Sequence, residues 1–187
     1  MQQPELVTLF LTLGMVASIL GCSLSQWVAK RVCKIKAYIG LQSIAALICI
    51  ISYFVASEQL ILAFVLFFLW SFFLQMATPL LWAKMADTID YGHWKTGIRI
   101  TGMVYSAVVF FIKLGVALGG ALAGWSLAYY GYQADSPQSV ETQQGILISF
   151  TIYPALGSIF AAWIMRRYTL NNQKVAQING ELKALAE

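Results

Sequence analysis

Charged side chains are scarce in this sequence: they make up 11% of its 187 residues, whereas 59% are hydrophobic. A soluble domain carries about a quarter charged residues, because its surface must face water. With a mean hydropathy of +0.71, this chain lacks the polar residues for such a surface. The composition therefore excludes a water-soluble domain. It predicts an all-α integral membrane protein, because its apolar stretches are continuous, unlike the alternating strands of a membrane barrel.

Cysteine and histidine are also rare, with three cysteines and one histidine in the chain. Cys22, Cys33 and Cys49 are odd in number and show no C-x-x-C spacing, so we interpret them as free thiols. His93 has no companion at a metal-binding spacing and is predicted to be a loop residue. The sequence contains no G-x-S-x-G, H-E-x-x-H or P-loop pattern. We therefore expect neither an enzyme nor a metal or cofactor site.

Five apolar stretches are long enough to cross about 30 Å of hydrocarbon at about 1.5 Å per residue. The first is too long for the core of a signal peptide and no basic residue precedes it, so we do not interpret it as a removable signal. The tail, residues 168–187, is predicted to be a short amphipathic cytoplasmic helix or, equally, a frayed end; its apolar residues at helical spacing are Val175, Ile178, Leu182 and Leu185. The five stretches, within a partial bundle of residues 1–167, are 6–28, 37–56, 60–83, 102–130 and 145–165.

Lysine and arginine are confined almost entirely to one side of this five-helix arrangement. Eleven of the twelve fall there, and the opposite loops, around residues 57–59 and 133–144, contain none. The positive-inside rule makes the basic side cytoplasmic, with the N-terminus outside and the C-terminus inside. The net charge of +4 then belongs to membrane loops, and no nucleic-acid partner is expected. An N-terminus outside the membrane without a signal peptide is unusual, and five is an odd number of helices for a transporter built of repeats. We therefore predict that the chain is part of a larger protein.

One charge, Lys113, lies within an apolar stretch. It follows Arg99 by 14 residues, which is about 21 Å along a continuous helix and places it near the middle of the bilayer. A central lysine costs roughly 3 kcal/mol to insert, so we expect it to face a water-filled cavity or an acidic partner. None of the eight acids lies deep in an apolar stretch, so that partner is expected on polypeptide outside this chain. The alternative is a lysine tolerated by local thinning of the membrane.

Small residues follow Lys113 along the same stretch. The patterns Gly115-x-x-x-Gly119 and Gly120-x-x-x-Gly124 are typical of helices that approach one another closely in membranes. We therefore predict a packing face for another helix here. A surface that slides during transport is compatible with the same pattern.

A charged segment follows the third apolar stretch. Pro79 lies just before it and is expected to kink the helix. Asp87 and Asp90 are three residues apart and share a face if the segment is helical, and Lys95 and Arg99 follow within reach. A paired charge cluster is therefore predicted at the cytoplasmic edge, where ion pairs can bias one conformation over another. The alternative is an ordinary solvated loop.

The charged segment and the fourth stretch together carry a family resemblance. The run Ala86-Asp87-Thr88-Ile89-Asp90-Tyr91-Gly92, then Arg99, then Lys113-Leu114-Gly115, resembles the glycoside–pentoside–hexuronide:cation symporters. These are the relatives of melibiose permease within the major facilitator superfamily. The resemblance covers nearly the whole chain and is strongest from Pro79 to Gly124. It implies that the five helices are the last five of twelve, and that a sugar or glycoside moves with Na⁺, H⁺ or Li⁺ by alternating access.

The resemblance also implies roles for individual residues. Lys113 matches the family's intramembrane lysine, which lies beside the sugar and cation sites. Its cytoplasmic charged network is matched by Asp87, Asp90 and Arg99. Thr78 stands where melibiose permease carries a cavity-facing tryptophan, so stacking of an aromatic ring on the sugar is not expected at that point.

Two departures from the family pattern stand out. Thr101 occupies a place where many relatives have an acid, which predicts a thinner charged network. The acids that bind the cation and grip the sugar lie on N-terminal helices in the family. The resemblance therefore implies that seven helices are missing and that the chain does not transport alone. The alternatives are a non-transporting scaffold or degenerate transporter remnant and, more remotely, a lipid-modifying enzyme that uses Asp87 and Asp90.

Overall fold

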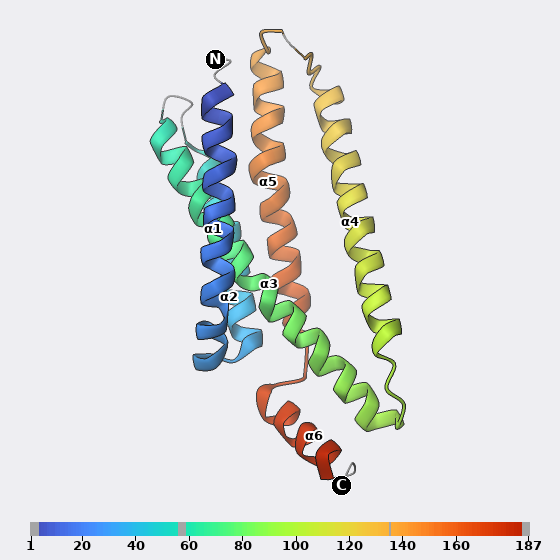
Figure 1. Cartoon of the computed structure of the whole chain (residues 1–187). Coiled ribbons are helices and arrows are strands. Elements are labelled where there is room, and N and C mark those ends of the chain that lie inside the picture. Colours follow the sequence, from blue (N-terminus) through green and yellow to red (C-terminus); the bar gives the residue numbers. More distant parts are fainter. Residues whose placement is uncertain (1–3, 56–58, 135, 185–187) are drawn as a thin grey trace.

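Six α-helices make up the part of the chain that the computed structural model describes, residues 4–55, 59–134 and 136–184. The first five are long and apolar enough to cross a membrane, which confirms the predicted all-α membrane fold. The sixth is short and lies beyond them at one end of the bundle (Figure 1). In chain order they are α1 (Pro4–Arg31), α2 (Lys34–Tyr53), α3 (Leu60–Thr96), α4 (Thr101–Tyr129), α5 (Val140–Met165) and α6 (Asn172–Ala184).

Helix α3 differs most from the sequence-based expectation. Its apolar stretch ends near residue 83, but the helix continues to Thr96, for 37 residues in all. Hydropathy falls where the chain leaves the membrane, whereas helical hydrogen bonds continue through a polar segment equally well. The helix ends at Gly97, whose φ of 72° suits glycine and whose N–H donates to the His93 carbonyl at 2.8 Å. His93 therefore lies on a helix, and its prediction as a loop residue was wrong. Pro79 lies inside the helix without ending it.

The ends of two other elements have clear local causes. Helix α5 starts five residues before its apolar stretch, because the Ser139 hydroxyl accepts the Thr142 N–H at 3.2 Å and caps the helix. The tail forms the predicted helix, α6, which buries Ile178. Leu185, from the predicted apolar stripe, and Ala56, from the predicted end of the second stretch, lie outside the described residues.

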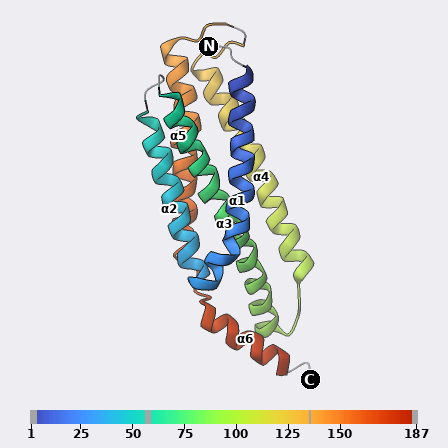
Figure 2. The same ribbon diagram turned by 60° about the vertical axis from the view of Figure 1, so that its left-hand side comes forward.

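Four of the long helices pack together and one stands apart. Helix α3 lies between α1 and α2, and α2 also packs along α5, whereas α4 diverges from the others over most of its length (Figures 1 and 2). The apolar core joins α2, α3 and the end of α5. Its buried members are Ala37, Tyr38, Leu41, Met76, Ala77, Leu80 and Met165.

A stripe of small residues lets α1 approach α3 closely. Gly14, Ala17, Gly21 and Ser25 recur every three or four residues and are all buried. A Cβ atom added at Gly21 would collide with the backbone carbonyl of Phe72 on α3. The close glycine packing expected of a membrane helix pair is therefore present on α1, where the sequence analysis did not place it.

Replacing Gly21 by alanine should separate these two helices. We expect Gly21→Ala to lower the free energy of unfolding by about 1–3 kcal/mol, because backbone atoms cannot move aside for the new methyl group. Loss of helical circular dichroism on titration with a denaturing detergent would measure it. Gly120→Ala is the matched control: nothing lies within 4 Å of its added Cβ, so it should be neutral or stabilise by up to about 1 kcal/mol. Equal effects of the two changes would contradict the packing described here.

Helix α4 has its buried contact near its connection to α5. Ser126 is its one buried residue, and its hydroxyl lies 3.1 Å from that of Ser149 and 3.3 Å from that of Tyr153 on α5. The remaining faces of α4 are open. No other part of the described chain comes within 4 Å of a Cβ added at Gly115, Gly119, Gly120 or Gly124.

Candidate functional site: a charged network at the basic end and an exposed membrane lysine

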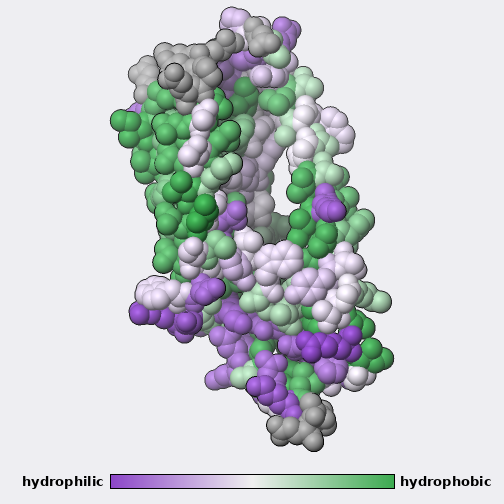
Figure 3. All heavy atoms as spheres, viewed as in Figure 1, coloured by the Kyte–Doolittle hydropathy of each residue, from purple (hydrophilic) through white to green (hydrophobic). Residues whose placement is uncertain are grey.

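The end of the bundle that contains Lys30, Arg31, Lys84, Arg166 and Arg167 is called the basic end here. Hydrophilic side chains gather on it and on α6, while the long helices above are largely hydrophobic (Figure 3). This segregation is expected of a protein whose basic end protrudes into water.

A buried ion pair lies at the centre of the basic end. Lys84 is 2% exposed, and its ammonium lies 2.8 Å from the Asp87 carboxylate one turn further along α3. Lys34, at the start of α2, approaches the same carboxylate at 3.7 Å. The shared face of Asp87 and its neighbours was predicted, but Lys84 was not recognised as its partner. The only feature of the sequence that could have indicated this pairing is the i,i+3 spacing of Lys84 from Asp87.

Lys84 also connects α3 to the chain that leaves α5. Its ammonium donates to the Leu170 carbonyl at 3.2 Å and lies 5.5 Å from the centre of the Tyr168 ring. The Tyr168 hydroxyl lies 2.9 Å from the Thr88 hydroxyl and donates to the Lys84 carbonyl at 3.1 Å. Burial, followed by the negative charge of Asp87, raises the pKa of the Tyr168 phenol, so it remains a hydrogen-bond donor at neutral pH.

A second ion pair in this segment, Asp90 with Arg99, is separate and more exposed. The guanidinium lies 3.4 Å from the carboxylate, with the side chains 61% and 27% exposed respectively. The Arg99 Nε also donates to the Thr101 hydroxyl at 3.4 Å. Thr101 therefore places a neutral group beside the arginine. Lys95 is exposed and joins none of the ion pairs of the described residues. The sequence predicted a single charge cluster, but the structure has two separate groups. One is the buried Asp87 with its lysines, and the other is the exposed Asp90–Arg99 pair.

Helix α6 lies against the end of α3. The Trp94 indole N–H donates to the Glu181 carboxylate at 2.6 Å, and the Lys174 ammonium lies 5.6 Å from the centre of the Tyr91 ring. Hydrogen bonds from Gln177 and Trp94 lower the pKa of the Glu181 carboxyl, so it stays ionised and keeps accepting both. Helix α6 thus covers the outer surface of the charged segment of α3.

Cys33 sits between α1 and α2 at the basic end. Its thiol lies 4.0 Å from the Asn172 side-chain oxygen. Burial would raise its pKa, but hydrogen bonds from the backbone at Ile35, Lys36 and Asn172, together with the Lys84 charge, outweigh burial and lower the pKa of the thiol. A larger fraction of Cys33 is therefore thiolate at neutral pH than in an unperturbed cysteine.

Lys113 is exposed on α4, and no acid of the described residues forms an ion pair with it. Helix α4 borders an open hollow that separates it from the other helices (Figure 3). The part of the chain that the structure describes therefore supplies no ion-pair partner for Lys113. Lys113 lies on α4, whereas the charged network lies on α3 and at the start of α2.

A cavity of about 360 Å³ lies between α3 and α4, on the side of Lys84. Thr78 lines it, and the Thr78 hydroxyl donates to the Gln75 side-chain oxygen at 3.0 Å. Trp82 also lines it and stacks on Tyr105 of α4, with ring centres 6.3 Å apart. Thr78 and Lys84 thus share one cavity, whereas Lys113 is not among its lining residues.

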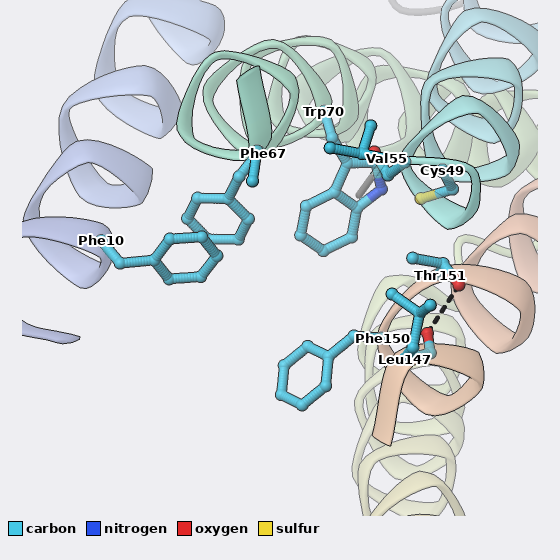
Figure 4. Close-up of a pocket in the computed structure, with 10 residues that line it drawn as sticks. Phe10, Cys49, Val55, Phe67, Trp70, Leu147, Phe150 and Thr151 are labelled. Carbon is cyan, nitrogen blue, oxygen red and sulfur yellow. Dashed lines mark hydrogen bonds between the residues drawn. The ribbon is translucent and has the colours of Figure 1, made fainter. Parts of the chain in front are cut away.

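A second cavity, of about 340 Å³, is lined by aromatic rings from several helices (Figure 4). Phe10 of α1 stacks on Phe67 of α3 at 3.7 Å between ring centres, and Trp70 lies beside Phe67. Phe150 projects from α5 at the other side (Figure 4). The buried Trp70 indole nitrogen has no hydrogen-bond acceptor among the described residues.

Comparison with known proteins identifies the family. The family model described as MFS/sugar transport protein matches residues 1–172. The chain belongs to this family of sugar transporters. The predicted resemblance is therefore confirmed, and the lipid-modifying enzyme considered from the sequence is wrong. The protein is an integral membrane protein.

Three curated relatives come from Escherichia coli K12. The inner membrane symporter YicJ is 37% identical over 166 residues, which cover 88% of this chain and 36% of YicJ. The putative glycoside/cation symporter YagG is 33% identical over 183 residues, covering 97% of this chain and 40% of YagG. A putative sulfoquinovose importer is 41% identical over 135 residues, covering 71% of this chain and 28% of the importer. The chain therefore spans less than half the length of each of these three relatives.

Proposed function

We propose that this chain is the C-terminal part of a secondary active sugar or glycoside:cation symporter that works by alternating access, with Na⁺ or H⁺ as the coupling cation. The observation that carries the proposal is Lys113, a charge on an apolar helix with no acidic partner in the described residues. A lysine at mid-membrane is stable only beside water or an opposite charge. In this proposal, the missing N-terminal helices of the transporter close over α4 and supply both.

The open face of α4 supports this arrangement. Its glycines have no neighbour within 4 Å, and its hydrophobic residues are exposed along its whole length. In our proposal the sugar and the cation occupy the space in front of α4, with Lys113 beside both. Thr78 lines the cavity between α3 and α4, and in our proposal its hydroxyl accepts a hydrogen bond from the sugar.

We assign the inner gate to Asp87, Asp90 and Arg99. The Asp90–Arg99 pair is exposed, so breaking it costs about 1 kcal/mol or less. Asp87 is held in place by two lysines, one of them buried. In this proposal the ion pairs of Asp87 stay formed and keep α2 and α3 together. The Asp90–Arg99 pair can break and form again with other partners when the cytoplasmic side opens. The basic end faces the cytoplasm in this proposal, with the N-terminus outside.

An uptake experiment tests the proposal. The chain is joined to the remaining helices of a full-length relative such as YicJ, and accumulation of a panel of radiolabelled glycosides is measured in membrane vesicles. We expect accumulation above the external concentration only in the joined protein. A sodium ionophore or a protonophore should reduce it to equilibration, which also identifies the coupling cation.

The 187-residue chain alone and the unaltered relative serve as the two controls. The chain alone should give no uptake of any glycoside. If the joined protein reaches the membrane at the level of the relative but never accumulates a glycoside, the chain is a degenerate remnant or scaffold and the proposal is wrong.

A further inference from the structure

A groove of about 300 Å³ lies between α2 and α5, which run side by side (Figure 2). Its walls include Leu47 and Ile50 of α2 and Ile159 and Trp163 of α5, which are 37–56% exposed. The aromatic cavity of Figure 4 meets α2 on a different face, at Cys49 and Ser52. The groove is therefore a separate feature on the outer surface of the bundle.

A cation stands at the basic end of this groove. Arg166 lines it, immediately after the last residue of α5, and is exposed. Arg166 follows Ile159 by seven residues and Trp163 by three, so the three residues share one face of the chain as it leaves the membrane. Its guanidinium joins none of the ion pairs of the described residues. The charge is thus free to meet an anion.

The facing helix lines the groove with a hydroxyl and carries a second cation beyond the lining residues, towards the basic end. Ser43 lines the groove from α2, and Lys36 precedes Ser43 by seven residues on that face of the helix. Lys36 is exposed and, like Arg166, has no acidic partner among the described residues. The groove is therefore apolar along its length and positive at one end.

We propose that this groove binds an anionic glycerophospholipid of the surrounding membrane. One acyl chain lies along the apolar walls, and the phosphate and the charged headgroup contact Arg166 and Lys36. Basic pockets between membrane helices recognise anionic headgroups in this way, and each cation near the surface favours such a lipid. Trp163 stands at the level where indole rings lie between headgroups and acyl chains. The inference needs only a folded chain in a lipid environment and does not rest on transport.

Native mass spectrometry of the 187-residue chain in detergent micelles tests the proposal. Phosphatidylglycerol and phosphatidylcholine with identical acyl chains are added separately, and the lipid-bound fraction is measured. We expect retention of phosphatidylglycerol over phosphatidylcholine. Arg166→Gln should lower phosphatidylglycerol binding about fivefold, as expected for one surface cation, and leave phosphatidylcholine binding unchanged.

Arg31→Gln is the matched control, because Arg31, like Arg166, is an exposed arginine at the basic end of a long helix, but it does not line the groove. It should leave lipid binding unchanged. Leu47→Trp keeps every charge and fills the groove from a residue that is 56% exposed, so it should lower retention of phosphatidylglycerol even if Arg166→Gln alters the fold. The proposal is overturned if both lipids bind equally, if the two arginine variants behave alike, or if Leu47→Trp has no effect.

Discussion

Lys113→Ala should abolish coupled uptake when the chain is joined to the remaining helices of a full-length relative. We expect accumulation of the glycoside to fall by about thirtyfold or more, because removing one partner of a buried charge pair costs about 2 kcal/mol or more. Lys113 has no partner in the described residues, so in our proposal its partner is an acid on the missing helices. The measurement is cation-driven accumulation in vesicles, normalised to the amount of protein in the membrane.

The control for this change is Val116→Ala, on the same helix. Val116 is 73% exposed and uncharged, and its shortening should leave accumulation within about twofold of the unaltered protein. Normal accumulation by the Lys113→Ala protein would show that the lysine lies outside the translocation path, tolerated by local thinning of the bilayer. That result would leave the family assignment intact and remove the role proposed for Lys113.

The second large effect is expected at Lys84. Lys84→Met keeps the volume of the side chain but leaves the Asp87 carboxylate with only Lys34, at 3.7 Å. We expect the free energy of unfolding to fall by about 3 kcal/mol, because a buried charge loses its main partner. Unfolding of the helical signal by a denaturing detergent gives the measurement. The same change also removes the contact of the ammonium with the Leu170 carbonyl.

Two further variants separate the ion pair from general disturbance. Lys84→Met combined with Asp87→Leu should recover most of the loss, since no charge is then buried without a partner. Asp90→Asn breaks the exposed pair with Arg99 and should cost about 1 kcal/mol or less. If Lys84→Met were as mild as Asp90→Asn, the buried pair would not stabilise the basic end.

The charged network shows where sequence reasoning succeeds and where it stops. Helical spacing placed Asp87 and Asp90 on one face, and the structure agrees because that segment of α3 is helical. Spacing did not reveal that Lys84 is buried and pairs with Asp87, whereas Lys95 stays in water. Which lysine is buried depends on contacts with Lys34 at the start of α2 and with the chain after α5, and these residues are far from Lys84 in sequence.

The glycines make the same point about packing. The spacing of Gly115, Gly119 and Gly120 on α4 predicted a close helix contact, but nothing in the described chain approaches them. Gly14 and Gly21 on α1 do pack tightly, against α3. A small-residue pattern indicates that a helix can approach, and the position of the neighbouring helices determines whether one does. For α4, the predicted close contact with another helix remains a prediction.

The sequence by itself determined the membrane class, the number of long apolar helices, the separation of basic residues to one side, and the position of Lys113 within an apolar stretch. These follow from the hydrophobicity and charge of each segment, since a segment enters or leaves the bilayer largely on its own composition. Only the tertiary structure decided the buried partner of Asp87, the docking of α6 on α3, and the groove between α2 and α5. Each of these features combines side chains from separate helices. It therefore depends on how the helices pack together and cannot be predicted from any one segment.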